Sequence, residues 1–126
     1  HYMDEAEQLC DRLVVMDGGR IAAEGSPVAL IREWSTREVV ELRFAAGDNE
    51  THGEKVEALV AQPGRPLQTL VSRIEVLPDR VLLYSDDGDG TVGELHRAGV
   101  APESVLVRRS SLEDVFLRLT GRSLVE

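Results

Sequence analysis

The sequence predicts an α+β protein, in which a ferredoxin-like domain of β-α-β-β-α-β order follows a helix and a β-hairpin. Two observations support this fold class. From Arg37 onward, segments with apolar residues at every second position alternate with segments in which they recur every three or four residues. Hydrophobic residues make up 42% of the 126 residues, which is enough for a chain of this size to bury a core. We therefore expect one small folded domain with an appendage.

The N-terminal region predicts a helix, a hairpin and a short second helix. Acidic residues crowd the start of the first helix, where they complement the helix dipole. The glycines of Asp17-Gly18-Gly19 supply the positive φ that a tight hairpin turn needs. Ser26 is placed to cap the second helix, with Pro27 at its first position. These elements are expected at residues 3–13, 13–16, 20–24 and 28–34.

The region after residue 37 predicts four strands and three helices. Two capping-box patterns, Thr91 with Glu94 and Ser110 with Glu113, mark the starts of the last two helices. The strands are expected at about 40–44, over about ten residues ending at Leu77, at 81–84 and at 105–107; the helices are expected at 50–62, from Thr91 to Gly99 and from Leu112 to Gly121.

The domain boundary is predicted at residues 35–37, because a complete set of alternating elements starts there. Residues 1–34 form the first predicted domain. Residues 37–126 form the second, and it includes the terminal helix.

Charge and cysteine content exclude several classes of protein. Twenty-three acidic residues against 14 basic ones give a net charge of -9, which would repel phosphates, so nucleic-acid binding is not expected. The single Cys10 cannot form an internal disulfide, and it lies on the apolar stripe of its helix, so we expect it in the core. No apolar run approaches the roughly 20 residues of a membrane span, and a cytosolic protein fits best. Because the chain starts at His1 without Met or a leader, it is expected to be part of a longer protein.

The most specific pattern in the sequence is a histidine followed by an acidic helix and a hairpin. It consists of His1-Tyr2-Met3-Asp4-Glu5-Ala6-Glu7, Cys10-Asp11-Arg12 and Met16-Asp17-Gly18-Gly19-Arg20-Ile21-Ala22-Ala23-Glu24-Gly25-Ser26-Pro27. This pattern resembles the end of the ATPase domain of ABC transporters, over residues 1 to about 34. The resemblance implies that His1 is the catalytic switch histidine, which in that family contacts the γ-phosphate of ATP and helps to place the attacking water.

A second resemblance lies at the other end of the chain. The tail Ser111-Leu112-Glu113-Asp114-Val115-Phe116-Leu117-Arg118-Leu119-Thr120-Gly121-Arg122 resembles the ending of bacterial drug-export ATPase subunits of the daunorubicin-resistance type. Those subunits carry an extra C-terminal domain. The resemblance implies the C-terminal fragment of the ATP-binding subunit of an ABC exporter for drug-like or hydrophobic cargo. It also implies a regulatory or dimerisation role for residues 37–126.

The motifs with which this family binds ATP are missing from the sequence. They are the phosphate loop G-x-x-x-x-G-K-[ST], the glutamine loop, the signature sequence and the acidic residues that hold Mg²⁺. We therefore expect no cofactor in this chain and no ATPase activity from the chain alone. For the full-length parent, the resemblance implies ATP and Mg²⁺ as cofactors. It further implies a homodimer, an integral-membrane permease as partner, and a cytoplasmic location at the inner face of the membrane.

Isolated polar residues have simpler explanations than a catalytic or metal site. Asp4, Glu5 and Glu7 complement a helix dipole, and no second His or Cys near them completes a metal site. His52 and His96 are separated from any nucleophile or carboxylate pair. A stand-alone hydrolase therefore has little support.

The loop that follows the third predicted strand of the second domain has part of the spacing of a calcium loop. Ser85, Asp87, Asp89 and Gly90 fall at positions 1, 3, 5 and 6, but position 1 is not Asp and position 12 is His96 instead of Glu. A solvated acidic turn is therefore expected.

Two functions from different classes stay open. The first is the exporter subunit. The alternative is an ACT-like regulatory module that senses a small molecule, for which Gly47-Asp48 offers only a faint glycine turn. The dimer is predicted to form through the terminal helix or through an apolar open face of the sheet. The residues expected on these two surfaces are Leu112, Val115, Phe116 and Leu119 for the helix, and Val39, Val71, Leu82 and Tyr84 for the sheet.

Overall fold

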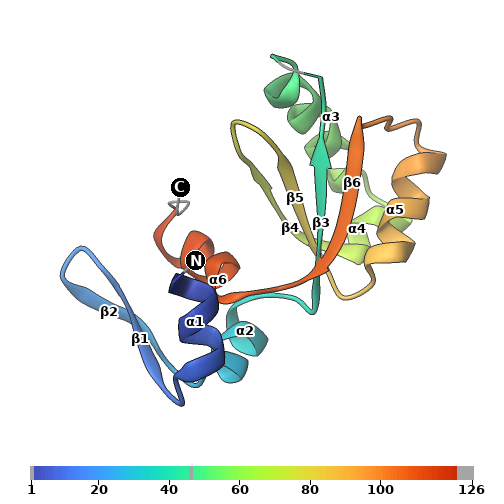
Figure 1. Cartoon of the computed structure of the whole chain (residues 1–126). Coiled ribbons are helices and arrows are strands. Elements are labelled where there is room, and N and C mark those ends of the chain that lie inside the picture. Colours follow the sequence, from blue (N-terminus) through green and yellow to red (C-terminus); the bar gives the residue numbers. More distant parts are fainter. Residues whose placement is uncertain (1, 46, 122–126) are drawn as a thin grey trace. The chain divides into compact units, whose positions relative to one another are not determined.

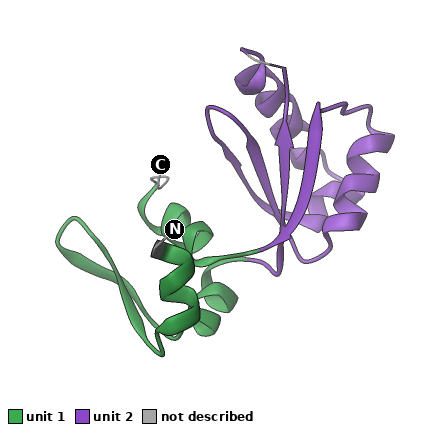
Figure 2. Cartoon of the chain, in the orientation of Figure 1, with its two compact units in different colours: residues 1–35, 110–126 green, residues 36–109 purple. Residues whose placement is uncertain are grey.

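The computed structural model describes residues 2–45 and 47–121, which fall into two compact units. Unit 1 consists of residues 1–35 and 110–126, and unit 2 consists of residues 36–109 (Figure 2). The candidate switch histidine, His1, lies outside the described residues.

Unit 1 contains α1 (Tyr2–Leu9), β1 (Leu13–Asp17), β2 (Arg20–Gly25), α2 (Pro27–Trp34) and α6 (Leu112–Thr120) (Figure 1). The strands form an antiparallel hairpin whose turn contains Gly18 and Gly19 at φ of 58° and 76°, as predicted. The N-cap of α2 is also confirmed, because the Oγ of Ser26 accepts a hydrogen bond of 3.1 Å from the N–H of Ala29.

The helix α6 lies in unit 1, whereas the predicted second domain, 37–126, includes it. The helix buries Leu112 and Val115 against Val15 of β1 and Leu30 of α2. Phe116 and Leu119 are partly buried in the same cluster, so the predicted apolar face of the helix is correct and its partner is different. In unit 2, helices already fill the apolar side of the sheet, which leaves no room there for α6.

Unit 2 has the predicted ferredoxin-like topology. Its elements are β3 (Glu38–Arg43), α3 (Asn49–Ala61), α4 (Pro66–Leu70), β4 (Val71–Val76), β5 (Val81–Ser85), α5 (Gly88–Arg97) and β6 (Ser104–Arg109). The strands form one antiparallel sheet in the order β4-β5-β3-β6. Figure 1 shows α3, α4 and α5 beside this sheet.

The core of unit 2 lies between the sheet and its helices. Every second residue of β3 and β5 contributes to it, which is the period expected of a half-buried sheet. The buried members are Val40, Leu42, Phe44, Val56, Leu67, Val71, Val81, Leu83 and Leu95.

Three local predictions are wrong, two of them in unit 2 and one at the start of α6. The ten-residue strand is shorter, because Pro66 opens the helix α4 instead and the strand starts at Val71. The capping box predicted at Thr91 is absent, because α5 starts three residues earlier at Gly88. The box predicted at Ser110 lies one residue later, at Ser111 and Asp114.

The prediction for Cys10 is also wrong. The helix α1 ends at Leu9, and Cys10 is exposed. The N–H of Cys10 still donates to the carbonyl of Ala6 at 3.1 Å, but the thiol does not reach the cluster around Val15.

Candidate functional site

The helix that follows His1 in the sequence is held by the N-terminus of α6. A carboxylate oxygen of Glu7 accepts a hydrogen bond of 2.9 Å from the N–H of Leu112. The carboxylate of Asp114, with only 2% of the residue exposed, accepts a bond of 2.8 Å from the N–H of Ser111. Both acids complement the positive end of the α6 dipole. Asp114 caps α6 locally, whereas Glu7 joins α1 to α6. No local pattern in the sequence could indicate the contact made by Glu7, because its partner is 105 residues away.

Asp4 and Glu5 lie in the first turn of α1, as the helix-dipole prediction expects. Among residues 2–45 and 47–121, no group of three or more His, Cys, Asp or Glu side chains could hold a metal ion. Asp4, Glu5 and Glu7 therefore form no metal site in the described structure.

The described residues do not form the kind of loop that holds a nucleoside triphosphate. The chain's one lysine, Lys55, lies inside α3 and directly follows Glu54, so it does not stand at the end of a glycine-rich loop. A triphosphate site needs such a loop, with successive N–H groups at a helix N-terminus.

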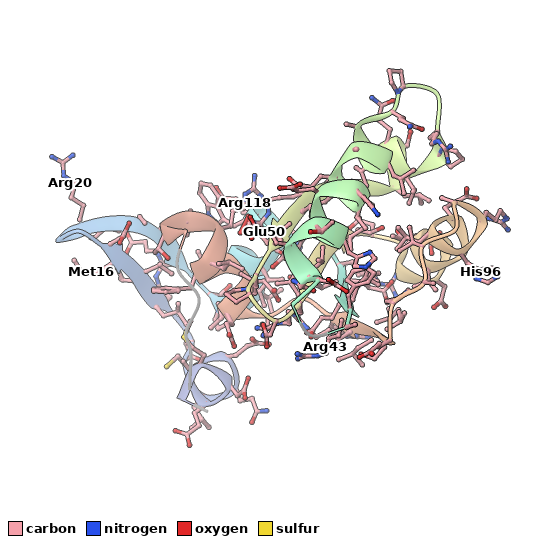
Figure 3. All side chains as sticks on the ribbon, turned by 90° about the horizontal axis from the view of Figure 1, so that it is seen from above. Met16, Arg20, Arg43, Glu50, His96 and Arg118 are labelled. Atoms are coloured by element: carbon pink, nitrogen blue, oxygen red, sulfur yellow. The ribbon has the colours of Figure 1, made fainter. Side chains whose placement is uncertain are left out.

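The predicted acidic turn at residues 85–90 is the N-cap of α5. The Oδ1 of Asp87 accepts a hydrogen bond of 2.9 Å from the N–H of Gly90. Ser85 is buried, and its Oγ accepts from the N–H of Asp87 at 3.0 Å. The hydroxyl of Thr91 lies 2.9 Å from the carbonyl oxygen of Asp87. These contacts explain the sequence pattern as helix capping, and Figure 3 shows His96 away from this turn, on the outer side of α5.

A cavity of about 420 Å³ lies in unit 2 between α3 and the end of β4. Three glutamates, Glu50, Glu54 and Glu57, line one side of it, and Figure 3 shows Glu50 on α3. Val76, Leu77 and Pro78 line the other side. The carboxylates would repel an anionic ligand, so this cavity suits only a neutral or cationic molecule.

The predicted apolar open face of the sheet is not an exposed surface. Val39, Leu82 and Tyr84 are 0%, 2% and 1% exposed, and Val71 belongs to the helix-side core. The guanidinium of Arg73 lies 4.1 Å from the centre of the Tyr84 ring, a cation–π contact that covers it.

Ion pairs extend over the same face of the sheet. Glu41 pairs with Arg108 and also lies 3.8 Å from Arg80. Long charged side chains thus lie over the part of this face around Glu41 and Tyr84.

The hairpin of unit 1 does expose apolar side chains. Met16 and Ile21 lie opposite each other in the register and are 52% and 61% exposed, and Val14 is 45% exposed. Val15, on the other side of β1, is buried at 5%. Figure 3 shows Met16 and Arg20 on this hairpin. We call Val14, Met16 and Ile21 the hairpin surface.

None of the helices in the described part of the chain is long and apolar enough to cross a membrane.

Comparisons with known proteins identify the family. The family model of the C-terminal domain of nodulation factor export protein NodI matches residues 48–121. The chain is 41% identical over 125 residues to a Nod factor export ATP-binding protein I of Rhizobium sp. (strain N33), covering 98% of this chain and 36% of the relative. Proteins of the same name are 41% identical in Mesorhizobium japonicum, covering 100% of this chain and 33% of the relative, and 42% identical in Rhizobium meliloti (strain 1021), covering 98% and 32%.

The fold and these relatives together define the class of the chain, which is the C-terminal part of an ATP-binding subunit of an ABC exporter. Within that class, the chain belongs to the family of NodI C-terminal domains. It spans about a third of the length of the relatives that it matches.

Proposed function

We propose that this chain is the C-terminal portion of a subunit that binds and hydrolyses ATP to drive export through an integral-membrane permease. The observation that carries the proposal is the identity of about 41% to Nod factor export ATP-binding proteins across nearly all of the chain. In the parent protein the subunit works on the cytoplasmic side of the membrane. ATP and Mg²⁺ are bound by parts of the subunit other than the described residues.

Unit 1 completes the ATPase domain of the parent. Its two-stranded hairpin is too small to be stable by itself, and it exposes Met16 and Ile21 on the side that faces away from α6. We expect the rest of the ATPase domain to cover this surface. His1 then acts as the switch histidine at the γ-phosphate.

Unit 2 is an accessory domain with a regulatory or assembly role, and the subunit acts as a homodimer. This role is favoured because unit 2 closes its own core and carries no part of a nucleotide site.

Two cargo classes follow from the similarities. The relatives are named for Nod factor export, and the tail resembles subunits that export drug-like compounds. Export of each class by cells that express the parent protein with its permease distinguishes them.

The decisive experiment replaces His1 in the parent protein. His1→Ala should lower ATP turnover by about 10²-fold while ATP binding changes little, because the histidine acts on the γ-phosphate in the transition state. Wild-type turnover in this variant would contradict the switch-histidine role. The isolated 126-residue chain should show no saturable ATP binding by calorimetry, and micromolar affinity would overturn our assignment of nucleotide binding to the rest of the subunit.

A second candidate function, a small-molecule sensor, is favoured by the cavity beside α3. A thermal-shift screen with neutral and cationic metabolites tests it, since a ligand that binds only the folded chain raises the melting temperature. Glu54→Gln should reduce that shift if the cavity is the site. A shift that Glu54→Gln leaves unchanged would place the ligand elsewhere.

A further inference from the structure

The two edges of the sheet in unit 2 differ in how they are protected against pairing with another strand. At one edge, β4 has a register irregularity between Val71 and Arg73. The strand also carries the charged residues Arg73 and Glu75, whose Nη1 and Oε1 atoms lie 3.2 Å apart. A bulge and charged side chains are the usual means by which an edge strand is kept from pairing with a second chain.

The other edge, β6, has no such bulge, and its charged residues, Arg108 and Arg109, occupy only its last two positions. It pairs with β3 in a continuous register from Ser104 to Arg109, without a bulge. Val105 and Leu106 are 44% and 54% exposed on it. An edge strand leaves alternate N–H and C=O groups without a partner in the sheet, so β6 offers both a hydrogen-bonding edge and apolar side chains.

The two ends of β6 carry opposite charges, so they would be complementary if two copies of the strand paired antiparallel. Glu103 directly precedes the strand, and its N–H donates to the carbonyl of Arg43 at 2.8 Å. Arg109 ends the strand. Both side chains are exposed, and within the described residues neither of them makes an ion pair.

One antiparallel register brings these features together. If Leu106 lies opposite Leu106 of a second copy, then Val105 faces Val107 of that copy and Glu103 faces Arg109. Side chains opposite each other in an antiparallel pair lie on the same face of the sheet, with Cβ atoms about 4.5–5.5 Å apart. The two-fold axis repeats the Glu103–Arg109 pair at both ends of the seam.

We infer that two copies of this chain pair through β6 in this register and form one continuous eight-stranded sheet. The inference rests on the homodimer of the proposed function and specifies β6 as the interface, or seam, between the two copies. It replaces both predicted seams, because α6 is used within unit 1 and charged side chains lie over the open face of the sheet.

A cross-linking experiment tests the position of the two-fold axis. In a Cys10→Ser background, Leu106→Cys should give a disulfide-linked dimer under mild oxidation, since the two Cβ atoms lie near the separation that a disulfide needs. The matched control is Val28→Cys, which replaces a side chain that is 63% exposed in unit 1. It should remain monomeric on a non-reducing gel at the same concentration.

A charge-reversal experiment tests the register. Glu103→Arg or Arg109→Glu places like charges at both ends of the seam and should raise the dimer dissociation constant about tenfold in sedimentation equilibrium. The double variant restores the pairs with reversed sign and should return to within about threefold of wild type. Arg65→Glu is the control for Arg109→Glu, because it makes the same change of charge at an exposed residue away from β6.

The outcomes separate the seam from the rest of the proposal. A wild-type chain that remains monomeric at tens of micromolar overturns both the seam and homodimerisation of the chain, and leaves its membership of an ATP-binding subunit untouched. If the chain dimerises, but none of the three charge variants changes the dissociation constant and Leu106→Cys gives no cross-linked dimer, then only the proposed interface is wrong. Circular dichroism of each variant confirms that the chain is folded.

Discussion

The two units of the molecule differ in how completely they close their cores. Unit 2 encloses nine buried hydrophobic residues between a four-stranded sheet and its helices. The corresponding cluster in the described part of unit 1 has four buried members, and the hairpin leaves Met16 and Ile21 more than half exposed. Unit 2 thus closes a core within itself, whereas the exposed hairpin of unit 1 agrees with our proposal that unit 1 completes a larger ATPase domain.

The largest expected effect comes from opening the core of unit 2. Leu83→Ala removes a fully buried side chain and should lower the free energy of unfolding by about 2–5 kcal/mol in urea denaturation. Hydrogen exchange should increase throughout unit 2. Leu9→Ala, at a side chain that is 79% exposed in unit 1, should stay within about 0.5 kcal/mol of wild type. Equal increases of exchange in both units after Leu83→Ala would show that the units do not fold separately.

A pair of glycine substitutions measures how tightly unit 2 is packed. A Cβ on Gly53 in α3 would lie 2.7 Å from a methyl carbon of Val76, so Gly53→Ala should destabilise the protein by about 1–3 kcal/mol. A Cβ on Gly93 in α5 meets only the end of Arg97, at 3.7 Å. Gly93→Ala should therefore stabilise the protein by about 1 kcal/mol, because alanine favours the helix. Thermal unfolding of the two variants checks the opposite signs.

A smaller effect is expected at the contact that joins the two ends of unit 1. Glu7→Ala removes the acceptor of the Leu112 N–H and should lower stability by about 1 kcal/mol. Its effect on hydrogen exchange should be confined to α1 and α6. Glu5→Ala, in the exposed part of the same helix, is the matched control, and a loss as large as that of Glu7→Ala would argue against a specific cap.

The smallest effect concerns pH and lies in unit 2. Burial acts to raise the pKa of Asp79, but the hydrogen bond from Arg43 and the charges of Arg80 and Arg43 outweigh it, and the pKa falls below the ordinary value of 3.8. The folded chain therefore gains a small stability above pH 3.8 that is lost as the pH falls through the lower pKa of the folded state. Asp79→Asn should lose this small stability at neutral pH and should flatten the stability profile below pH 4. A steeper profile in Asp79→Asn would reverse the predicted sign.

The sequence was sufficient to predict the topology of unit 2, because alternating apolar residues and turn residues are local signals. The helix α4 was missed although Pro66 stands at its first position, since a five-residue helix shows too little periodicity. The capping box predicted at Thr91 was wrong because Asp87 is the N-cap residue, so the helix already starts at Gly88.

The partner of α6 could not be predicted from local signals. Its apolar face was identified correctly, but an apolar stripe does not specify which surface it covers. The same limit applies to Val39, Leu82 and Tyr84, whose alternation indicates a buried face without showing that charged side chains lie over it. The switch histidine rests on the resemblance alone, because His1 lies outside the described residues.

The placement of unit 2 between the two segments of unit 1 has a consequence for the order of folding. To bring α6 onto α1 and α2, an unfolded chain must close a loop over residues 36–109, at an entropic cost of about 4 kcal/mol. In the folded unit 2, Glu38 lies opposite Arg109 on neighbouring strands, so the two ends of that loop are already side by side. The hydroxyls of Ser35 and Ser110 then meet in a hydrogen bond. We expect unit 2 to fold first, and by doing so to turn the docking of α6 from a long-range search into a local step.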